Sequence, residues 1–316
     1  MKKVKPFVKW AGGKGALIGQ LTEYYPIELK SGLIDTYIEP FVGGGAVLLD
    51  ILQNYQIKKA YAFDINKDLI NCYNVIKKSP KELIQHLKDK EKNFMLLSME
   101  DRQIYFYTIR EKYNSNITED DIVERASQFI FLNRTCFNGL YRVNNKGKFN
   151  VPFGKYKNPT ICDEENIMNL SDLIQNVEFI NGQYYESKKY ITKNTFVYFD
   201  PPYRPLPKTN SFTSYMKEEF NDESQKELAN YFVILDKSGV KVMLSNSNPK
   251  NTDKNDYFFE NLYKGFNINE VYAKRMINSN SKGRGAISEL LITNYYNMEM
   301  NECIKENSFM KIAISN

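Results

Sequence analysis

Short runs of apolar and β-branched residues alternate with longer segments of helical periodicity along most of the chain. Seven runs have the length of strands: residues 33–39, 61–63, 178–180, 195–199, 240–244, 268–274 and 290–295. A helix is expected over residues 46–52, after the first strand and a glycine-rich turn. Strands that alternate with helices favour an α/β fold with a mostly parallel sheet.

A long segment of helical pattern separates the second expected strand from the third. It covers residues 66–176, which is far longer than a normal crossover connection, so we expect an inserted domain. Within it the pattern predicts helices over residues 67–76, 80–90, 102–113 and 119–134. Residues 140–153 have the turn residues of a β-hairpin, centred on Asn145, Lys146 and Gly147.

The composition excludes several classes of enzyme. The chain has 316 residues and a single histidine, His86. Almost no histidine is therefore available for a histidine-based triad or for a zinc site with histidine ligands. The four cysteines are too widely spaced for a zinc site or a small disulfide framework, which predicts a reduced, cytoplasmic protein without a metal. No signal-peptide pattern and no run of 18 apolar residues occurs, so we expect neither export nor a membrane span.

Positive charge is concentrated in one part of the expected insert. The formal net charge is only +5, but residues 126–162 contain no acidic residue and six basic ones: Arg134, Arg142, Lys146, Lys148, Lys155 and Lys157. Aromatic and amide side chains are interspersed there, a mixture that suits phosphate contacts, hydrogen bonds to base edges and stacking. The N-terminal residues are basic too, so two segments could flank one polyanion; a solvated loop is the simpler alternative.

The sequence Asp200-Pro201-Pro202-Tyr203 directly follows the expected strand 195–199. Ligands of open α/β sheets bind beyond the carboxyl ends of strands. Two prolines fix two φ angles and remove two N–H donors, so this turn presents acceptors, chiefly the Asp200 carboxylate and the Pro201 carbonyl. Acceptors suit the exocyclic amine of a nucleobase, whose lone pair they would aim at an electrophile. Tyr203 offers a ring for stacking a flipped base; a structural proline-rich turn is the alternative.

A second candidate site follows the first expected strand. Its sequence is EPFVGGGA, from Glu39 to Ala46, and its glycines permit a tight turn and close approach of a ligand to the backbone. Asp64 ends the second expected strand, where an acid can accept hydrogen bonds from ribose hydroxyls. Together they predict a nucleoside-bearing cofactor without a pyrophosphate cradle, whereas the glycines alone are equally typical of a plain turn.

Several sequence blocks, and the order in which they follow one another, resemble the Dam-type, α-group DNA adenine-N6 methyltransferases. The blocks are PFVKWAGGK, EPFVGGGAVLLD, AFDINKDLI, FLNRTCFNGLYRVNNKGKFNVPFGKYKNP, FDPPY and SELLITNY, and they span roughly residues 6–295. The resemblance implies a Rossmann-like, seven-stranded methyltransferase sheet, S-adenosyl-L-methionine as cofactor, and methyl transfer to N6 of a flipped adenine in double-stranded DNA. It implies a discontinuous catalytic domain that binds S-adenosylmethionine, residues 1–66 and 163–316, and a mainly helical target-recognition domain with a β-hairpin, residues 67–162.

The resemblance also implies roles for individual residues. The cofactor-binding positions are Trp10, Lys14, Glu39, Phe41, Gly43, Gly45, Asp64 and Asp200. Catalysis and the pocket for the flipped adenine fall to Asp200, Pro201, Pro202 and Tyr203. The DNA-binding positions are Lys9 on a guanine, Leu140, Arg142 and Pro152 on the remaining bases, Phe137 as a wedge in the duplex, and Asn138 on a phosphate. A lysine or arginine on a guanine is also the commonest specific base contact on chemical grounds.

These positions predict methylation of the adenine in GATC. Three alternatives stay open: an α-group adenine methyltransferase with another DNA target, an RNA amino methyltransferase, and a DNA-binding regulator without turnover. The hairpin block argues against RNA, and the intact Lys14, Asp64, Asp200 and Tyr203 argue against the regulator. We also expect a monomer, with a cognate restriction endonuclease acting separately, and we assign no role to residues 297–316.

Overall fold

The computed structural model describes residues 3–115, 121–204, 220–273 and 287–296. The chain divides into two compact units: unit 1 comprises Met1–Gly15, Glu39–Asn54 and Lys58–Tyr190, and unit 2 comprises Ala16–Ile38, Tyr55–Ile57 and Ile191–Asn316. The functional domains implied by the resemblance stay a prediction, because compactness does not assign a function. The ends of two expected elements, at residues 119–120 and 274, and the tail 297–316 lie outside the described residues.

The seven expected strands are confirmed. They are β1 (Thr36–Glu39), β2 (Lys59–Asp64), β3 (Val177–Asn181), β4 (Thr195–Phe199), β5 (Lys241–Ser247), β6 (Asn267–Ala273) and β7 (Ile287–Thr293). Their order in the sheet is β3-β2-β1-β4-β5-β7-β6. The pairs β2–β3, β1–β4 and β4–β5 are parallel, while β7 is antiparallel to both β5 and β6. This mixed sheet with helices agrees with the expected α/β class.

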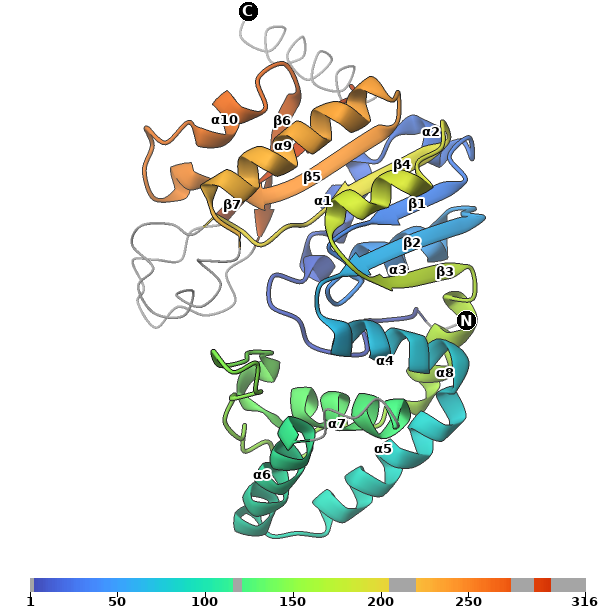
Figure 1. The fold of residues 1–316 in the computed structure, drawn as a ribbon, viewed down its shortest axis with the longest axis vertical. Helices are drawn as coiled ribbons and strands as arrows, with labels where there is room; N and C mark the ends of the chain where they lie inside the picture. Colours follow the sequence, from blue (N-terminus) through green and yellow to red (C-terminus); the bar gives the residue numbers. More distant parts are fainter. Residues whose placement is uncertain (1–2, 116–120, 205–219, 274–286, 297–316) are drawn as a thin grey trace, which may run out of the picture. The chain divides into compact units, whose positions relative to one another are not determined.

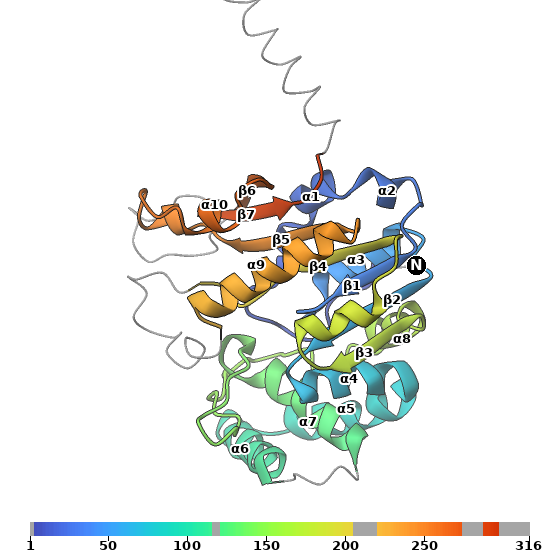
Figure 2. The same cartoon turned by 45° about the horizontal axis from the view of Figure 1, so that its top comes forward.

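Unit 1 combines β2 and β3 with the helices of the expected insert (Figure 1). The helices of the insert are α4 (Lys67–Lys78), α5 (Pro80–Met95), α6 (Met99–Ser115), α7 (Ile122–Thr135) and α8 (Glu164–Leu173). Unit 1 also contains α3 (Ala46–Asn54), which precedes β2 and is the helix expected over residues 46–52. The helix α7 contacts α4, α5 and α6, and ten of its residues are buried. It is therefore the central helix of this group, as Figure 2 also shows.

Residues 140–153 lack the regular ladder of the expected β-hairpin. Val143 and Phe149 form an isolated antiparallel pair, and an Asn144 carbonyl accepts the N–H of the turn glycine at 2.8 Å. The Asn114 side chain accepts a hydrogen bond from the N–H of Phe149 at 2.8 Å and donates one to its C=O at 3.0 Å. The Asn144 side chain accepts two further N–H groups of the turn. Two backbone hydrogen bonds flank the Val143–Phe149 pair, from the N–H of Asn144 to the Lys148 carbonyl at 2.9 Å and from the N–H of Asn150 to the Arg142 carbonyl at 3.1 Å. Asparagine side chains thus supplement the few backbone bonds of a short, irregular hairpin.

Unit 2 contains β1 as far as Ile38, together with β4, β5, β6 and β7. Its described residues include the helices α1 (Ile18–Leu21), α2 (Ile27–Lys30), α9 (Asp222–Lys237) and α10 (Phe258–Leu262). Strand β4 is buried along its whole length, and α9 contacts β5 (Figure 1). The Asn221 side chain caps α9 by accepting the N–H groups of Glu223 and Ser224.

The first strand is shorter than the pattern of residues 33–39 predicts. The N–H groups of Leu33 and Ile34 donate to the Glu28 carbonyl, so these residues close the turn after α2 and do not enter the sheet. Leu33 is 65% exposed. The apolar run at residues 33–39 therefore predicts the strand correctly but overestimates its length.

No helix in the described residues is both long and apolar enough to cross a membrane.

Candidate functional site

The turn after β1, called here the glycine turn (residues 40–45), is tied to the end of β2. The N–H of Gly43 donates to one carboxylate oxygen of Asp64 at 3.1 Å, and the N–H of Asn66 donates to the other at 2.8 Å. The N–H of Val42 donates to the Phe63 carbonyl at 2.9 Å. Burial raises the pKa of Asp64, and the two backbone N–H groups partly offset that rise. The structure thus brings the predicted glycines and the predicted acid together.

The glycines are required by packing within the protein as well as by backbone conformation. Gly43 and Gly45 have φ angles of 47° and 72°, which residues with a side chain rarely adopt. A Cβ at Gly43 would lie 2.8 Å from Cδ1 of Trp10, and one at Gly45 would lie 2.5 Å from the hydroxyl of Tyr73. We expected the glycines to admit a ligand, but at these two positions the neighbours are side chains of the chain itself.

Tyr73 is a buried support for the glycine turn that sequence reasoning did not find. Its hydroxyl donates to the Gly43 carbonyl at 3.0 Å. Burial, together with the nearby charges of Glu39 and Asp64, holds the pKa of Tyr73 well above its usual value, so the hydroxyl remains a donor. The only sequence signal is that Tyr73 lies on the buried face of the helix that follows Asp64.

The other predicted cofactor residues of unit 1 differ in exposure. Trp10 is partly exposed and stacks on Tyr141, with ring centroids 5.7 Å apart. Lys14 is buried, and its ammonium donates to the Gly12 carbonyl at 2.8 Å. Glu39 is buried, whereas the partly exposed ring of Phe41 stacks on Tyr184 at 5.6 Å.

The predicted wedge and phosphate residues lie together on a short 3-10 turn, Phe137–Gly139, at the end of α7. Phe137 is 49% exposed, although large apolar side chains are usually buried. Its backbone N–H donates to the carbonyl of Pro152 at 2.8 Å, so two predicted DNA contacts are directly linked. Asn138 is exposed and has a φ of 55°. The turn thus presents an aromatic ring and an amide to solvent.

Lys9 and Arg142 lie in the same unit as this turn. The Lys9 backbone pairs with the side chain of Asn133 through an N–H contact of 2.8 Å and a C=O contact of 2.9 Å. Its ammonium lies 4.8 Å from the ring centroid of Tyr156. The Arg142 guanidinium donates from Nε to Oδ1 of Asn150 at 2.7 Å. Leu140 and Arg142 are both partly exposed, and Pro152 is exposed.

The second candidate site, called here the proline turn (residues 200–203), follows β4 in unit 2. Asp200 is partly exposed and Pro201 is buried. The carbonyl of Pro202 accepts a hydrogen bond from the side chain of Gln225 on α9, at 3.1 Å. Gln225 is fully buried and accepts in turn from the side chain of Asn246 on β5, at 3.0 Å. A buried amide chain therefore fixes the end of the proline turn.

The ring of Tyr203 is held by a carboxylate. Its hydroxyl donates to Oε2 of Glu289 on β7 at 2.5 Å. Burial is the main cause of a Tyr203 pKa well above the usual value, and the negative charges of Asp200 and Glu289 raise it further. Tyr203 is therefore a protonated donor, and its ring direction is set by a residue more than eighty positions away.

Arg204 holds the chain directly after the proline turn. Its guanidinium makes two hydrogen bonds to the Asp222 carboxylate, at 2.8 and 3.1 Å, and one to Asp256 at 2.7 Å. It also lies 4.1 Å from the ring centroid of Phe258. The hydrogen bonds to the two carboxylates raise the pKa of Arg204. Because planar, two-pronged contacts are geometrically specific, Arg204 fixes the turn to the start of α9.

Sequence reasoning missed the groups that support the proline turn: Arg204, Asp222, Gln225, Asn246, Asp256 and Glu289. Arg204 is next to the motif, so adjacency could have indicated it. The others come from α9, β5, β7 and a loop, and no local spacing marks them. Among the described residues, no group of three His, Cys, Asp or Glu side chains is arranged to hold a metal ion.

Comparison with known proteins places the chain in a family. Residues 10–277 match the D12 class N6 adenine-specific DNA methyltransferases. The chain is 52% identical over 294 residues to the type II methyltransferase M.MjaIII of Methanocaldococcus jannaschii, covering 93% of this chain and 100% of the relative. It is 38% identical over 297 residues to the type II methyltransferase M1.LlaDCHI of Lactococcus lactis subsp. cremoris, covering 93% of this chain and 96% of that relative.

A third relative is the DNA adenine methylase of Vibrio cholerae, which is 36% identical over 292 residues, 92% of this chain and 96% of the relative. The family match spans both the glycine turn and the proline turn. Each of these matches covers nearly the whole length of the relative. The chain therefore belongs to the D12 class of N6 adenine-specific DNA methyltransferases, and it is an adenine-specific DNA methyltransferase.

Proposed function

We propose that this methyltransferase transfers a methyl group from S-adenosyl-L-methionine to N6 of a flipped adenine within GATC in double-stranded DNA. The observation that carries the proposal is the fixed proline turn, in which the buried Gln225 side chain engages the Pro202 carbonyl and the partly exposed Glu289 carboxylate engages the Tyr203 hydroxyl. The glycine turn follows β1 and the proline turn follows β4, and these strands are parallel neighbours with Ile38 opposite Val197. Ligands of such sheets bind beyond the carboxyl ends of the strands.

The residues of the glycine turn fit a nucleoside-bearing cofactor. Each oxygen of Asp64 accepts one backbone N–H, and because a carboxylate offers about four acceptor sites, it retains capacity for ribose hydroxyls. The partly exposed rings of Trp10 and Phe41 add surface for an adenine or a methionine chain. S-adenosylmethionine would supply a methyl group on a positively charged sulfur. We assign its binding to Trp10, Lys14, Glu39, Phe41, Gly43, Gly45, Asp64 and Asp200.

The proline turn would hold the amino group of the target base. We assign the acceptor role to the Asp200 carboxylate and the Pro201 carbonyl, because Gln225 already engages the carbonyl of Pro202. Acceptance of both amino hydrogens favours a pyramidal nitrogen and a localised lone pair, which is catalysis by orientation and electrostatics. Tyr203 would stack on the base, since Glu289 fixes its hydroxyl. These four residues, Asp200 to Tyr203, are the proposed catalytic group.

The exposed residues around Phe137 would contact the duplex. We assign guanine contact to Lys9, readout of the other bases to Leu140, Arg142 and Pro152, insertion into the duplex to Phe137, and phosphate contact to Asn138. The exposure of Phe137 and the direct link between its N–H and Pro152 support a common role. We further propose that residues 67–162 form the target-recognition domain, that residues 1–66 with 163–316 form the catalytic domain, and that the enzyme acts as a monomer.

Two relatives bear the name type II methyltransferase, and a third bears the name DNA adenine methylase. The first name favours a restriction-modification context, with a cognate endonuclease acting separately. A different DNA target is a second candidate function, because the name of M.MjaIII, which is 52% identical to this chain, states no target sequence. Both candidates predict the same chemistry at N6 and differ only in the sequence that is methylated.

The deciding experiment combines purified protein, S-adenosylmethionine with a labelled methyl group, and two duplexes that differ by one base pair of a single GATC site. We expect label in the GATC duplex alone, recovered as N6-methyladenine after digestion. Label in neither duplex would contradict the proposed reaction on DNA of this sequence. Equal label in both would contradict GATC as the target and favour the second candidate.

Replacing Arg142 by alanine is expected to relax discrimination at one base pair by about 1–3 kcal/mol, because arginine contacts to a base edge carry specificity. The measurement is kcat/KM on GATC and on its single-pair variants. Lys148→Ala is the matched control, since Lys148 is an exposed cation of the same segment. We expect it to weaken binding equally for all sequences. The same uniform weakening in Arg142→Ala would identify Arg142 as a phosphate contact instead.

A further inference from the structure

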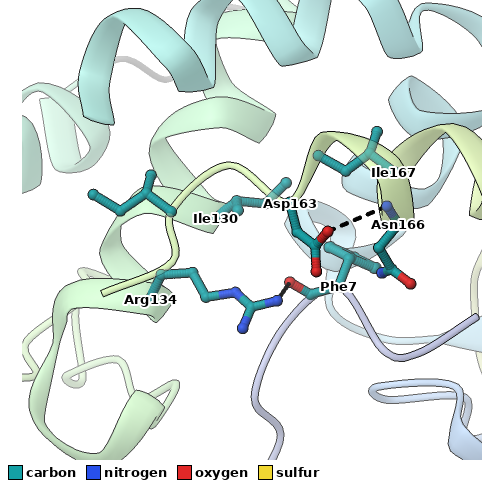
Figure 3. A pocket seen from close by; sticks show the side chains of 7 residues that line it. Phe7, Ile130, Arg134, Asp163, Asn166 and Ile167 are labelled. Atoms are coloured by element: carbon teal, nitrogen blue, oxygen red, sulfur yellow. Dashed lines mark hydrogen bonds between the residues drawn. The ribbon is translucent and has the colours of Figure 1, made fainter. Parts of the chain in front are cut away.

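The N-terminal segment is held by side chains at every second residue. The side chain of Asn166 pairs with both the N–H and the C=O of Lys5, each at 2.9 Å. The guanidinium of Arg134 donates to the Phe7 carbonyl at 2.7 Å, as Figure 3 shows beside a small cavity. The side chain of Asn133 pairs in the same way with the N–H and the C=O of Lys9. Contacts at every second residue are typical of an extended chain. Here side chains make the hydrogen bonds that a neighbouring strand would make in a sheet.

Asn133 differs from Asn166 in one further contact. Its amide nitrogen also donates to the carbonyl of Gly139 at 2.9 Å, and Asn133 is only 1% exposed. The two N–H groups of this amide therefore have two carbonyl partners, while its oxygen accepts the Lys9 N–H. One buried side chain thus joins the N-terminal segment to the Phe137–Gly139 turn.

The same two segments also pack against each other directly. Gly139 has a φ of 63°, and a Cβ built on it would lie 2.4 Å from Cδ of Lys9. The methylene chain of Lys9 therefore lies on the Gly139 backbone, and only glycine leaves room for it. The position of Lys9 depends on the turn that presents Phe137 and Asn138.

We propose that Asn133 is a positioning residue for target choice, which holds Lys9 and the Phe137–Gly139 turn in one fixed arrangement on the DNA. The inference rests on the proposed readout of a guanine by Lys9. Asn133 is buried and does not itself contact the base; it sets where the Lys9 ammonium can reach when Phe137 enters the duplex. Without Asn133, the lysine and the wedge would move independently, and discrimination at the guanine read by Lys9 would fall.

The test replaces Asn133 by aspartate, which keeps the acceptor for the Lys9 N–H but loses both donors to carbonyls. We expect the ratio of kcat/KM between GATC and the duplex altered at the guanine pair to fall about tenfold or more, as for loss of a base contact. Entry of the wedge, followed by the fluorescence of 2-aminopurine at the target adenine, should weaken at the same time. Asn166→Ala is the matched control, because Asn166 makes the same pair with Lys5. Its ratio should stay within about twofold of the unaltered enzyme.

A second variant keeps the inference testable if Asn133→Asp fails to fold. Gly139→Ala places a methyl group against the Lys9 chain and should reduce the same ratio. Lys9→Ala separates the two claims. If Lys9→Ala leaves the ratio unchanged, both the Lys9 readout and the role of Asn133 are wrong. If Lys9→Ala lowers the ratio but the folded Asn133→Asp enzyme leaves it unchanged, the role of Asn133 alone is wrong. If Asn133→Asp does not fold, the same conclusion follows when Gly139→Ala leaves the ratio unchanged. An equal fall in Asn166→Ala would also overturn it, because the effect would then be general loosening.

Discussion

Replacement of Asp200 by alanine is expected to reduce the rate of methyl transfer by about a thousandfold or more, while DNA binding changes little. The carboxylate is the only charged group of the proline turn, and removal of a single positioned group that stabilises charge in a transition state costs about 10²–10³ in rate. Loss of orientation of the amino group adds to that cost. Single-turnover methylation measures the rate, and fluorescence anisotropy of a labelled duplex measures binding.

Two further variants define what the Asp200 result means. Asp200→Asn should lose less activity than Asp200→Ala, because it keeps one acceptor oxygen. It should still be less active than the unaltered enzyme, because its amide nitrogen donates where the carboxylate accepts. Glu223→Gln removes a carboxylate that is 74% exposed on the neighbouring helix α9, and it should leave the rate within about twofold. Full activity in Asp200→Ala would remove Asp200 from the catalytic group, and parallel loss in Glu223→Gln would point to a general effect of charge.

The strands could be predicted because their apolar runs are local. Strand β4 begins and ends where the run at residues 195–199 does, since every one of its residues is buried. Strand β5 continues to Ser247, three residues past the predicted end at residue 244. Ser245 and Asn246 can be buried there because Ser245 shares a hydrogen bond with the Tyr198 hydroxyl and Asn246 donates to the Gln225 side chain. In the sequence alone, a polar residue suggests the end of a strand, even when its side chain is buried and hydrogen-bonded inside the sheet.

The environment of the two turns could be predicted only in part. Asp64 and the glycines were recognisable because Asp64 ends one strand and the glycines follow another, and the topology then brings them together. The partners of the proline turn were not, because Gln225, Asn246 and Glu289 are polar residues of ordinary helices and strands that meet Pro202 and Tyr203 only after folding. Similarly, Asn114 and Asn133 pair with peptide groups far along the chain, and no local pattern encodes such a pair.

Replacement of Asp64 by alanine is expected to weaken S-adenosylmethionine binding by about a hundredfold or more. The change removes the proposed ribose acceptor and leaves the N–H groups of Gly43 and Asn66 without their carboxylate, and each buried polar group left unpaired costs about 1–3 kcal/mol. Isothermal titration calorimetry with S-adenosylmethionine measures the effect directly and in the absence of DNA.

The control for this prediction is Asn181→Ala, which removes a side-chain hydrogen bond of 3.0 Å to the Asp64 carbonyl but keeps the carboxylate. It should lower cofactor affinity by no more than about threefold, so equal losses in the two variants would show that the local backbone, and not the carboxylate, governs binding. Because burial raises the pKa of Asp64 above 3.8, the carboxylate is protonated at a higher pH than an exposed aspartate. Affinity should therefore decline as the pH falls toward that raised pKa, and this decline should be absent in Asp64→Ala.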